Sequence, residues 1–287
     1  MLIKLRNKQE LNLPEDIIAS VMLGTDKKYL HSGTSYVLNL VRQMQRTKGK
    51  YLLYKPHLAC LYNIAEHLSG EYSSYFEPFG GVGVTAKIFN APQTFVNDYD
   101  PLCVRVLCRN FQPFQVSQVD MADSVQRKDL YHKQQGVDIV HLDYNNYTLH
   151  KFATDKPVFG KGVGYRETTT EAFACAAKFV IINDCTPTLL TKGRLNAHSL
   201  NDPPFSGFAH VSRELGQAVT TRDGFFAALV PYYAKALPAW HLTRIEHFRE
   251  SSYLLFRKDG PRPLTIHKHD AEELRRNPVA EVVEDAQ

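Results

Sequence analysis

The 287-residue sequence is poor in the features that mark secreted, metal-binding and membrane proteins. Its five cysteines are an odd number, and no two of them form a C-x-x-C pair. Free thiols in a reducing compartment are the simplest explanation. The N-terminus lacks the apolar core of a signal peptide, and no apolar run approaches the roughly 18 residues of a membrane span. These absences predict a soluble, intracellular, cytoplasmic protein with no membrane partner.

Two common phosphate-binding motifs are also missing. No G-x-G-x-x-G fingerprint follows a strand, and no Gly-Lys-Ser/Thr completes a P-loop. The net charge is only +4, so the composition permits contact with nucleic acid but does not require it. Hydrophobic residues make up 44% and aromatic residues 11% of the chain, enough for a sizeable core. Wholesale disorder is therefore excluded.

The first part of the chain has helical periodicity. Apolar residues recur at helical spacing in KPHLACLYNIAEHL (55–68), and Pro14 stands where a first helical turn begins. We predict an N-terminal helical segment over residues 1–70.

From residue 71 the pattern changes to short apolar runs that alternate with helical stretches. This alternation predicts a mostly parallel, doubly wound α/β sheet, with strands at 74–79, 94–98, 114–120, 137–143 and 177–184. Two later strands, 240–248 and 251–258, are separated by only two residues, which requires an antiparallel hairpin. We predict an α/β domain over 71–259, followed by a charged surface tail over 260–287.

The strongest local signal is EPFGGVGVTAKIF (77–89), where a predicted strand ends, three glycines follow and a helix begins. Glycines allow a sharp turn and let a ligand approach the backbone closely. The N-terminus of the helix offers N–H groups to a polar ligand. The alternative is a turn whose glycines serve packing alone.

The pattern E-P-F-x-G-x-G resembles the Dam-type family of adenine-specific DNA methyltransferases, and the family-like order covers roughly residues 46–258. The resemblance implies a class I methyltransferase (Rossmann-like) fold that binds S-adenosylmethionine. Acids that end the second and third strands would hold the ribose and the adenine, with Asp100 as the alternative to Asp98. Each acid alone is more often a helix cap. The implied cofactor-binding residues are Lys50, Glu77, Pro78, Phe79, Gly80, Gly81, Gly83, Asp98 and Asp120.

The family methylates an exocyclic amine with the motif D/N-P-P-Y/F after the fourth strand. An acid or amide oxygen and a backbone carbonyl accept the amine hydrogens, and the aromatic ring stacks on the flipped base. Here VDIVHLD (137–143) supplies the strand and Asp143 the acid, but the motif departs from the family because both prolines are absent. The implied catalytic set is Asp143, Tyr144, Asn145, Asn146 and Tyr147.

Asp202-Pro203-Pro204-Phe205 matches this motif at all four positions. It follows a polar stretch that cannot form a buried central strand, and it comes after the fifth strand rather than the fourth. We interpret it as a proline-stiffened surface loop. Three explanations of the altered motif stay open: a methyltransferase with adapted geometry, one that acts on another amine or on RNA, and a protein that kept the fold without the chemistry.

Basic residues interleaved with aromatics and glycines occur in an insertion at about 144–176 and in a loop over 185–220. Such a mixture suits phosphate contact and base stacking, although an ordinary solvated loop has the same composition. The predicted substrate contacts are Lys151, Lys161, Arg166, Lys192 and Arg194. The segment TIHKHD (265–270) offers no third ligand at a plausible spacing, so no metal site is predicted.

The sequence thus predicts an S-adenosylmethionine-dependent methyltransferase that acts on adenine in DNA or RNA. The rival hypothesis is a catalytically silent member of the same fold that serves as a structural subunit, binding nucleic acid or partner proteins.

Overall fold

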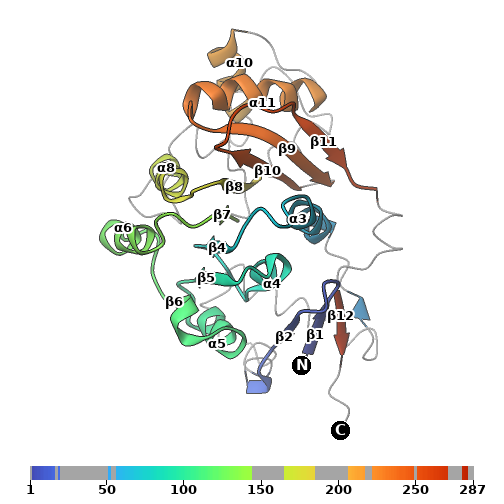
Figure 1. Ribbon diagram of the computed structural model, residues 1–287, viewed down its shortest axis with the longest axis vertical. Helices are drawn as coiled ribbons and strands as arrows, with labels where there is room; N and C mark the ends of the chain where they lie inside the picture. The colour runs from blue at the N-terminus through green and yellow to red at the C-terminus, as the bar shows by residue number, and fades with distance from the viewer. Residues whose placement is uncertain are drawn as a thin grey trace. The chain divides into compact units, whose positions relative to one another are not determined.

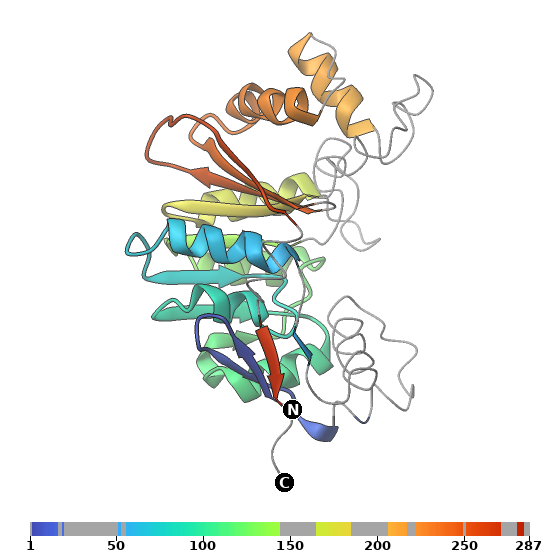
Figure 2. The same ribbon diagram turned by 90° about the vertical axis from the view of Figure 1, so that its right-hand side faces the viewer.

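The computed structural model describes residues 2–16, 19, 51–52, 56–143, 165–184, 206–216, 222–248, 251–270 and 280–283 (Figures 1 and 2). It divides into two compact units. Unit 1 comprises Met1–Asp120 with His269–Gln287, and unit 2 comprises Met121–Lys268. The predicted boundaries at residues 70 and 259 therefore do not coincide with the division of the chain.

Unit 1 contains three strands that pair in the order β4-β5-β6, all parallel. The strands are β4 (Ser74–Glu77), β5 (Gln93–Asn97) and β6 (Val116–Ser117). The helices of this unit are α3 (Pro56–His67), α4 (Val84–Phe89) and α5 (Pro101–Asn110), with a 3₁₀ turn η2 (Pro113–Gln115). The strand–helix alternation predicted from residue 71 onward is confirmed here. Because parallel strands alternate with helices, the carboxyl ends of β4, β5 and β6 open at one edge.

A second, antiparallel sheet in unit 1 was not predicted. Its order is β2-β1-β12-β3, and Figure 1 shows the last strand, in red, beside the first, in blue. The helical prediction for 1–70 is wrong for β1 (Leu2–Leu5), β2 (Glu10–Asn12) and β3 (Tyr51–Leu52). In β1, Ile3 and Leu5 are buried and Lys4 is exposed, which is the period of a strand. The tail prediction is wrong for β12 (Ala280–Val283) and for β11 (Thr265–Lys268) of unit 2.

Unit 2 contains five strands in the order β11-β9-β10-β8-β7. Strands β7 and β8 are parallel, while β8 with β10 and β10 with β9 are antiparallel. The predicted hairpin is confirmed, with Phe248 opposite Ser251. The chain therefore has an α/β fold whose mostly parallel strands are completed by an antiparallel hairpin. The strands are β7 (Ile139–Leu142), β8 (Phe179–Asp184), β9 (His241–Phe248), β10 (Ser251–Arg257) and β11.

The helices of unit 2 are α6 (Ser124–Lys133), α8 (Tyr165–Cys175), α10 (Ser206–Leu215) and α11 (Arg222–Ala236). Two of them correct predictions. Helix α10 lies inside the segment 185–220 that the sequence assigned to a loop. Helix α8 lies inside the predicted insertion 144–176, yet Ala172 and Phe173 are buried in the core. The ring of Phe173 packs edge-on against Trp240 and Phe256.

Helix α8 also carries the charged partners of a buried arginine. Arg127 of α6 has no exposed surface, and its guanidinium contacts Glu171 at 2.5 Å and Glu167 at 2.8 Å. These two acids raise the Arg127 pKa against the opposing effect of burial. The end of the predicted insertion is therefore a structural helix. Among the described residues, no helix is both long and apolar enough to cross a membrane.

Candidate active site

The glycine turn of unit 1 connects β4 to α4 at the carboxyl edge of the parallel strands. The Gly80 N–H donates to the Asn97 carbonyl at 2.8 Å, which ties the turn to β5. The Gly83 N–H donates to the Gly80 carbonyl at 2.8 Å, which closes the turn on itself. Gly83 then starts α4 from the left-handed region, at φ 84°. The chain reverses here in a conformation that favours glycine.

The three glycines of this turn have different roles. A Cβ on Gly80 would lie 2.0 Å from Val96 Cγ1, and one on Gly83 would lie 2.6 Å from Phe111 Cε2. Packing alone therefore requires glycine at these two positions. Gly81 has φ +53°, and a Cβ there would meet no atom within 4 Å. Only at Gly81, among the three, does the backbone face open space that a ligand can occupy.

Asp98 follows β5 directly and holds the turn through its carboxylate. The Gly81 N–H donates to Oδ2 at 2.8 Å, and the Asp100 N–H donates to Oδ1 at 2.9 Å. Burial raises the Asp98 pKa from 3.8 to about 6, although both hydrogen bonds work in the opposite direction. A carboxylate has about four lone-pair sites, and the Tyr99 backbone is a third hydrogen-bond partner of Asp98, so about one site is left for a further donor. A hydroxyl group of a ligand is a donor of this kind.

Asp100, the alternative to Asp98 as ribose ligand, caps the N-terminus of α5. It is almost fully buried, and its Oδ1 accepts the Leu102 N–H at 2.9 Å as the N-cap of α5. Tyr99, between the two acids, has its pKa raised to about 12 by burial and then by the charges of Asp98, Asp100 and Asp120. The acids predicted after the second and third strands are therefore close enough to affect the pKa of the same tyrosine.

Asn97 is a key residue of this edge that sequence reasoning missed. Its Nδ2 donates to the Pro78 and Val119 carbonyls, both at 3.0 Å. Its Oδ1 accepts from the Val119 N–H and the Ser117 hydroxyl, both at 2.9 Å. All four hydrogen bonds of this fully buried amide are thus made inside the protein. Asn97 fixes the residues that follow β4 and β6 to the end of β5, and only its position at a strand end could have pointed to this role.

Glu77, at the end of β4, is 2% exposed and accepts a hydrogen bond from the Tyr75 hydroxyl at 3.1 Å. Pro78 is buried and Phe79 is partly exposed. Asp120 is also partly exposed. The first and third predicted strands thus bring their terminal acids to the same edge of unit 1, where Gly81 and Asp98 lie.

In unit 2, Asp143 follows β7 and lies in a polar row that crosses three strands. In the parallel register of β7 and β8, Leu142 pairs with Ile182, so Asp143 comes beside Asn183. In the antiparallel register of β8 and β10, Asn183 pairs with Tyr253. The Asn183 Nδ2 donates to Asp143 Oδ1 at 3.0 Å and to the Tyr253 hydroxyl at 3.2 Å. The amide therefore orients the carboxylate and is itself oriented by the phenol.

His141 lies two residues before Asp143 on β7 and is fully buried. Burial lowers its pKa from 6.5 to about 4, and the nearby Asp143 only partly opposes this effect. Its ring centre lies 5.9 Å from that of Tyr253. His141 is therefore neutral near pH 7 and belongs to the packed interior behind the polar row.

Of the predicted substrate contacts, the structure describes Arg166 alone. It lies on α8 and is exposed to solvent, and its charge opposes the effect of burial, which raises the Tyr232 pKa to about 12. The loop motif Asp202–Phe205 lies outside the described residues. So do Lys50, Tyr144, Asn145, Asn146, Tyr147, Lys151, Lys161, Lys192 and Arg194. Their roles stay predictions from the sequence.

The TIHKHD segment has a neighbour that the sequence did not indicate. Its strand, β11, pairs in parallel with β9, and the register sets His267 opposite Glu246. Glu246 is fully buried and accepts a hydrogen bond from Arg244 Nε at 2.5 Å. The segment is thus an edge strand of unit 2 rather than part of a surface tail.

Comparison with known proteins does not place the chain in a family. No family model matches it, and no curated protein matches it in sequence. Several solved structures resemble it distantly. Magnesium protoporphyrin IX methyltransferase from Synechocystis PCC 6803 with bound SAH is 11% identical, with a TM-score of 0.43 over 71% of this chain and 84% of that one.

Two further solved structures resemble this chain to a similar degree. The plantazolicin methyltransferase BpumL in complex with SAH is 8% identical, with a TM-score of 0.45 over 86% of this chain and 98% of that one. A methyltransferase from Geobacter sulfurreducens is 13% identical, with a TM-score of 0.37 over 86% and 92%. Likeness at this level assigns neither a family nor an activity.

Proposed function

We propose that the protein is an S-adenosylmethionine-dependent methyltransferase that acts on the exocyclic amine of adenine in DNA or RNA. The observation that carries the proposal is the coupling of Gly81 to Asp98. The one open, positive-φ glycine of the turn donates its N–H to the acid that ends β5. The resemblance of the sequence motif supports a cofactor site at this turn.

The residues of unit 1 fit such a cofactor. Gly81 leaves room for a ligand against the backbone, and the Asp98 carboxylate beside it keeps about one acceptor site for a ribose hydroxyl. Asp120 stands where the family-like order expects the contact to adenine. Carboxylates also suit a ligand with a positive charge. S-adenosylmethionine, when bound, supplies a methyl group on a sulfonium, which makes the methyl carbon electrophilic.

The role proposed for Asp143 follows from the weakness of the substrate amine. Its lone pair is delocalised into the base, so nitrogen must be drawn toward a tetrahedral geometry before it attacks. A carboxylate that accepts an amine hydrogen favours this change. Asn183 already donates to Asp143 Oδ1 at 3.0 Å. We infer that the Asp143 carboxylate accepts the amine hydrogen.

The choice of adenine rests on the resemblance of the sequence motifs rather than on a described substrate pocket. Tyr144 or Tyr147 would stack on the base, in place of the aromatic residue of the family motif. DNA and RNA stay alternatives, because both carry the same amine.

The absent prolines favour a second candidate function. Tyr144 and Asn145 stand where the family motif has two prolines, which fix the backbone carbonyl that accepts from the amine. Without them, the loop loses that restraint. A silent subunit that binds nucleic acid without methyl transfer is the function that this departure supports.

A methyl-transfer assay separates the two functions. Tritiated methyl incorporation is measured with single-stranded DNA, double-stranded DNA and RNA, using the full chain. We expect incorporation into adenine in one of these, and its loss by more than about 100-fold in Asp143→Ala, as for removal of an acid–base group. Asp202→Ala is the matched control and should keep activity. Loss in Asp202→Ala alone would transfer the catalytic role to that loop, and cofactor binding without transfer to any of the three would favour the silent subunit.

A further inference from the structure

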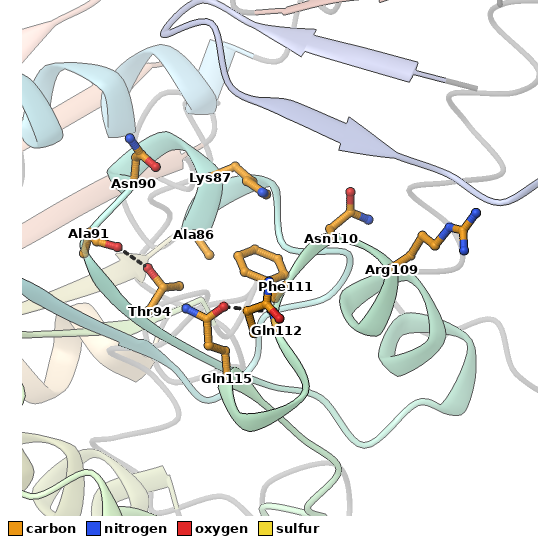
Figure 3. Close-up of a pocket in the computed structure, with 10 residues that line it drawn as sticks. All are labelled: Ala86, Lys87, Asn90, Ala91, Thr94, Arg109, Asn110, Phe111, Gln112 and Gln115. Atoms are coloured by element: carbon orange, nitrogen blue, oxygen red, sulfur yellow. Dashed lines mark hydrogen bonds between the residues drawn. The ribbon is translucent and has the colours of Figure 1, made fainter.

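Unit 1 has a polar cavity between the carboxyl ends of α4 and α5 (Figure 3). Its volume is about 260 Å³. The lining comes from α4 with the residues after it, from β5 and from the segment that ends α5 and forms η2. The lining contains no carboxylate, and the residues that face a ligand include Lys87, Asn90, Phe111, Gln112 and Gln115.

Lys87 gives this cavity a positive charge. Its Nζ lies 4.8 Å from the centre of the Phe111 ring, and Figure 3 shows the side chain passing above that ring. Among the described residues, no carboxylate lies within salt-bridge distance of Lys87. Partial burial lowers the Lys87 pKa. An ammonium in this setting gains from an anionic partner.

A second hydrogen-bond donor comes from Gln115. Its Oε1 accepts the Gln112 N–H at 2.9 Å, and this bond fixes the orientation of the amide. The Nε2 group is then directed elsewhere and has no partner within the described part of the chain. Thr94 cannot supply its proton, because its hydroxyl donates to the Ala91 carbonyl at 2.9 Å. Lys87 and Gln115 therefore both offer donors to a ligand.

The ends of two helices do not cancel this charge. A carbonyl at the end of a helix carries partial negative charge and would repel an anion. The Asn7 side chain, however, donates to the Lys87 carbonyl at 2.9 Å and to the Ile88 carbonyl at 3.0 Å. The Asn110 Nδ2 donates to the Val106 carbonyl at 2.7 Å at the end of α5. Both helix ends are thus capped by side-chain amides, and Lys87 is not needed for that role.

We propose that this cavity binds a phosphate group, held by the Lys87 ammonium and the Gln115 amide. Arg109 is exposed, and in Figure 3 its side chain extends away from the other residues. It would therefore attract the ligand at longer range rather than contact it. The source of the phosphate is either a free phosphomonoester or the backbone of a nucleic acid, since both present the same oxygens. The inference is independent of the proposed methyl transfer.

The test is a titration of the full chain, followed by amide chemical shifts. The probes are inorganic phosphate, adenosine monophosphate and a short single-stranded oligonucleotide. We expect saturable shifts of Asn90, Phe111, Gln112 and Gln115 with one or more of these. Binding should weaken by at least about tenfold in Lys87→Gln, the loss of a charge-assisted hydrogen bond, and should persist in Lys87→Arg.

Lys4→Gln is the control, because Lys4 is an exposed cation of the same unit. It should bind each probe as the parent protein does. Saturation by adenosine monophosphate or phosphate assigns the site to a free ligand, and saturation by the oligonucleotide alone assigns it to a nucleic-acid phosphate. The proposal is overturned if no probe shifts these amides, or if Lys87→Gln and Lys4→Gln weaken binding equally.

Discussion

The glycine turn supports a prediction in which two neighbouring alanine substitutions have opposite consequences. In Gly80→Ala the new Cβ would lie 2.0 Å from Cγ1 of Val96, which is 1% exposed. A buried β-branched side chain has little freedom to move, so the substitution should destabilise unit 1 by about 1–3 kcal/mol or more. In Gly81→Ala no atom lies within 4 Å of the new Cβ, and only the positive φ is unfavourable, at about 1–2 kcal/mol.

Cofactor affinity should follow the reverse order. The methyl group of Gly81→Ala would occupy the space that we assign to the cofactor. An overpacking penalty of about 1–3 kcal/mol corresponds to roughly 5- to 150-fold weaker binding. The folded molecules of Gly80→Ala should bind the cofactor with an affinity closer to that of the parent protein than Gly81→Ala does. The assays are urea unfolding for stability and calorimetry with S-adenosylhomocysteine for affinity.

Gly70→Ala separates backbone strain from ligand contact. Gly70 also has a positive φ, at +80°, and a Cβ added there would meet no atom within 4 Å, but it lies in the turn after α3. It should lose similar stability to Gly81→Ala and no affinity. The reasoning is refuted if Gly81→Ala binds as tightly as Gly70→Ala, because the open face of Gly81 would then not contact the ligand.

Three further predictions concern the polar row and the two shifted pKa values. Asn183→Ala should lower kcat for methyl transfer with little change in KM for the nucleic acid, and Tyr253→Phe should lower kcat less. If Asn183→Ala only reduced the amount of folded protein, kcat per folded molecule would stay unchanged. The depressed pKa of His141 means that unit 2 loses up to about 3 kcal/mol of stability as the pH falls from 6.5 to 4, and His141→Phe should remove this slope in hydrogen exchange of β7 and β8. The raised pKa of Asp98 has the opposite sign, so unit 1 should lose up to about 3 kcal/mol as the pH rises from 4 through 6, and β4 and β5 should show no such slope in Asp98→Ala.

Much of the α/β fold could be predicted because its strands are short apolar runs that alternate with helical stretches. The hairpin at 241–257 was predictable from a two-residue connection, which allows no other geometry. The small sheet of unit 1 was not, since β3 has two residues and β12 is far from β1 in the sequence. A strand of two residues is too short to show the alternation of apolar and polar residues. The pairing of β1 with β12 joins the two ends of the chain, so no local sequence pattern indicates it.

The site divides in the same way. The turn at Gly81 and the acid at Asp98 were found because each follows a strand in a fixed motif. The four-bond role of Asn97 and the row from Asp143 to Tyr253 were not, because they depend on strand register. A register is fixed by pairing between distant segments, and one sequence does not determine it. The sequence also could not distinguish Gly80, which packs against Val96, from Gly81, which faces open space.

Calorimetry of the full chain with S-adenosylhomocysteine tests the central claim most directly. We predict saturable binding with one site, weakened by more than about tenfold in Asp98→Ala through the loss of charge-assisted hydrogen bonds. Absence of binding by the folded parent protein, or equal affinity of the parent and Asp98→Ala, would contradict the account.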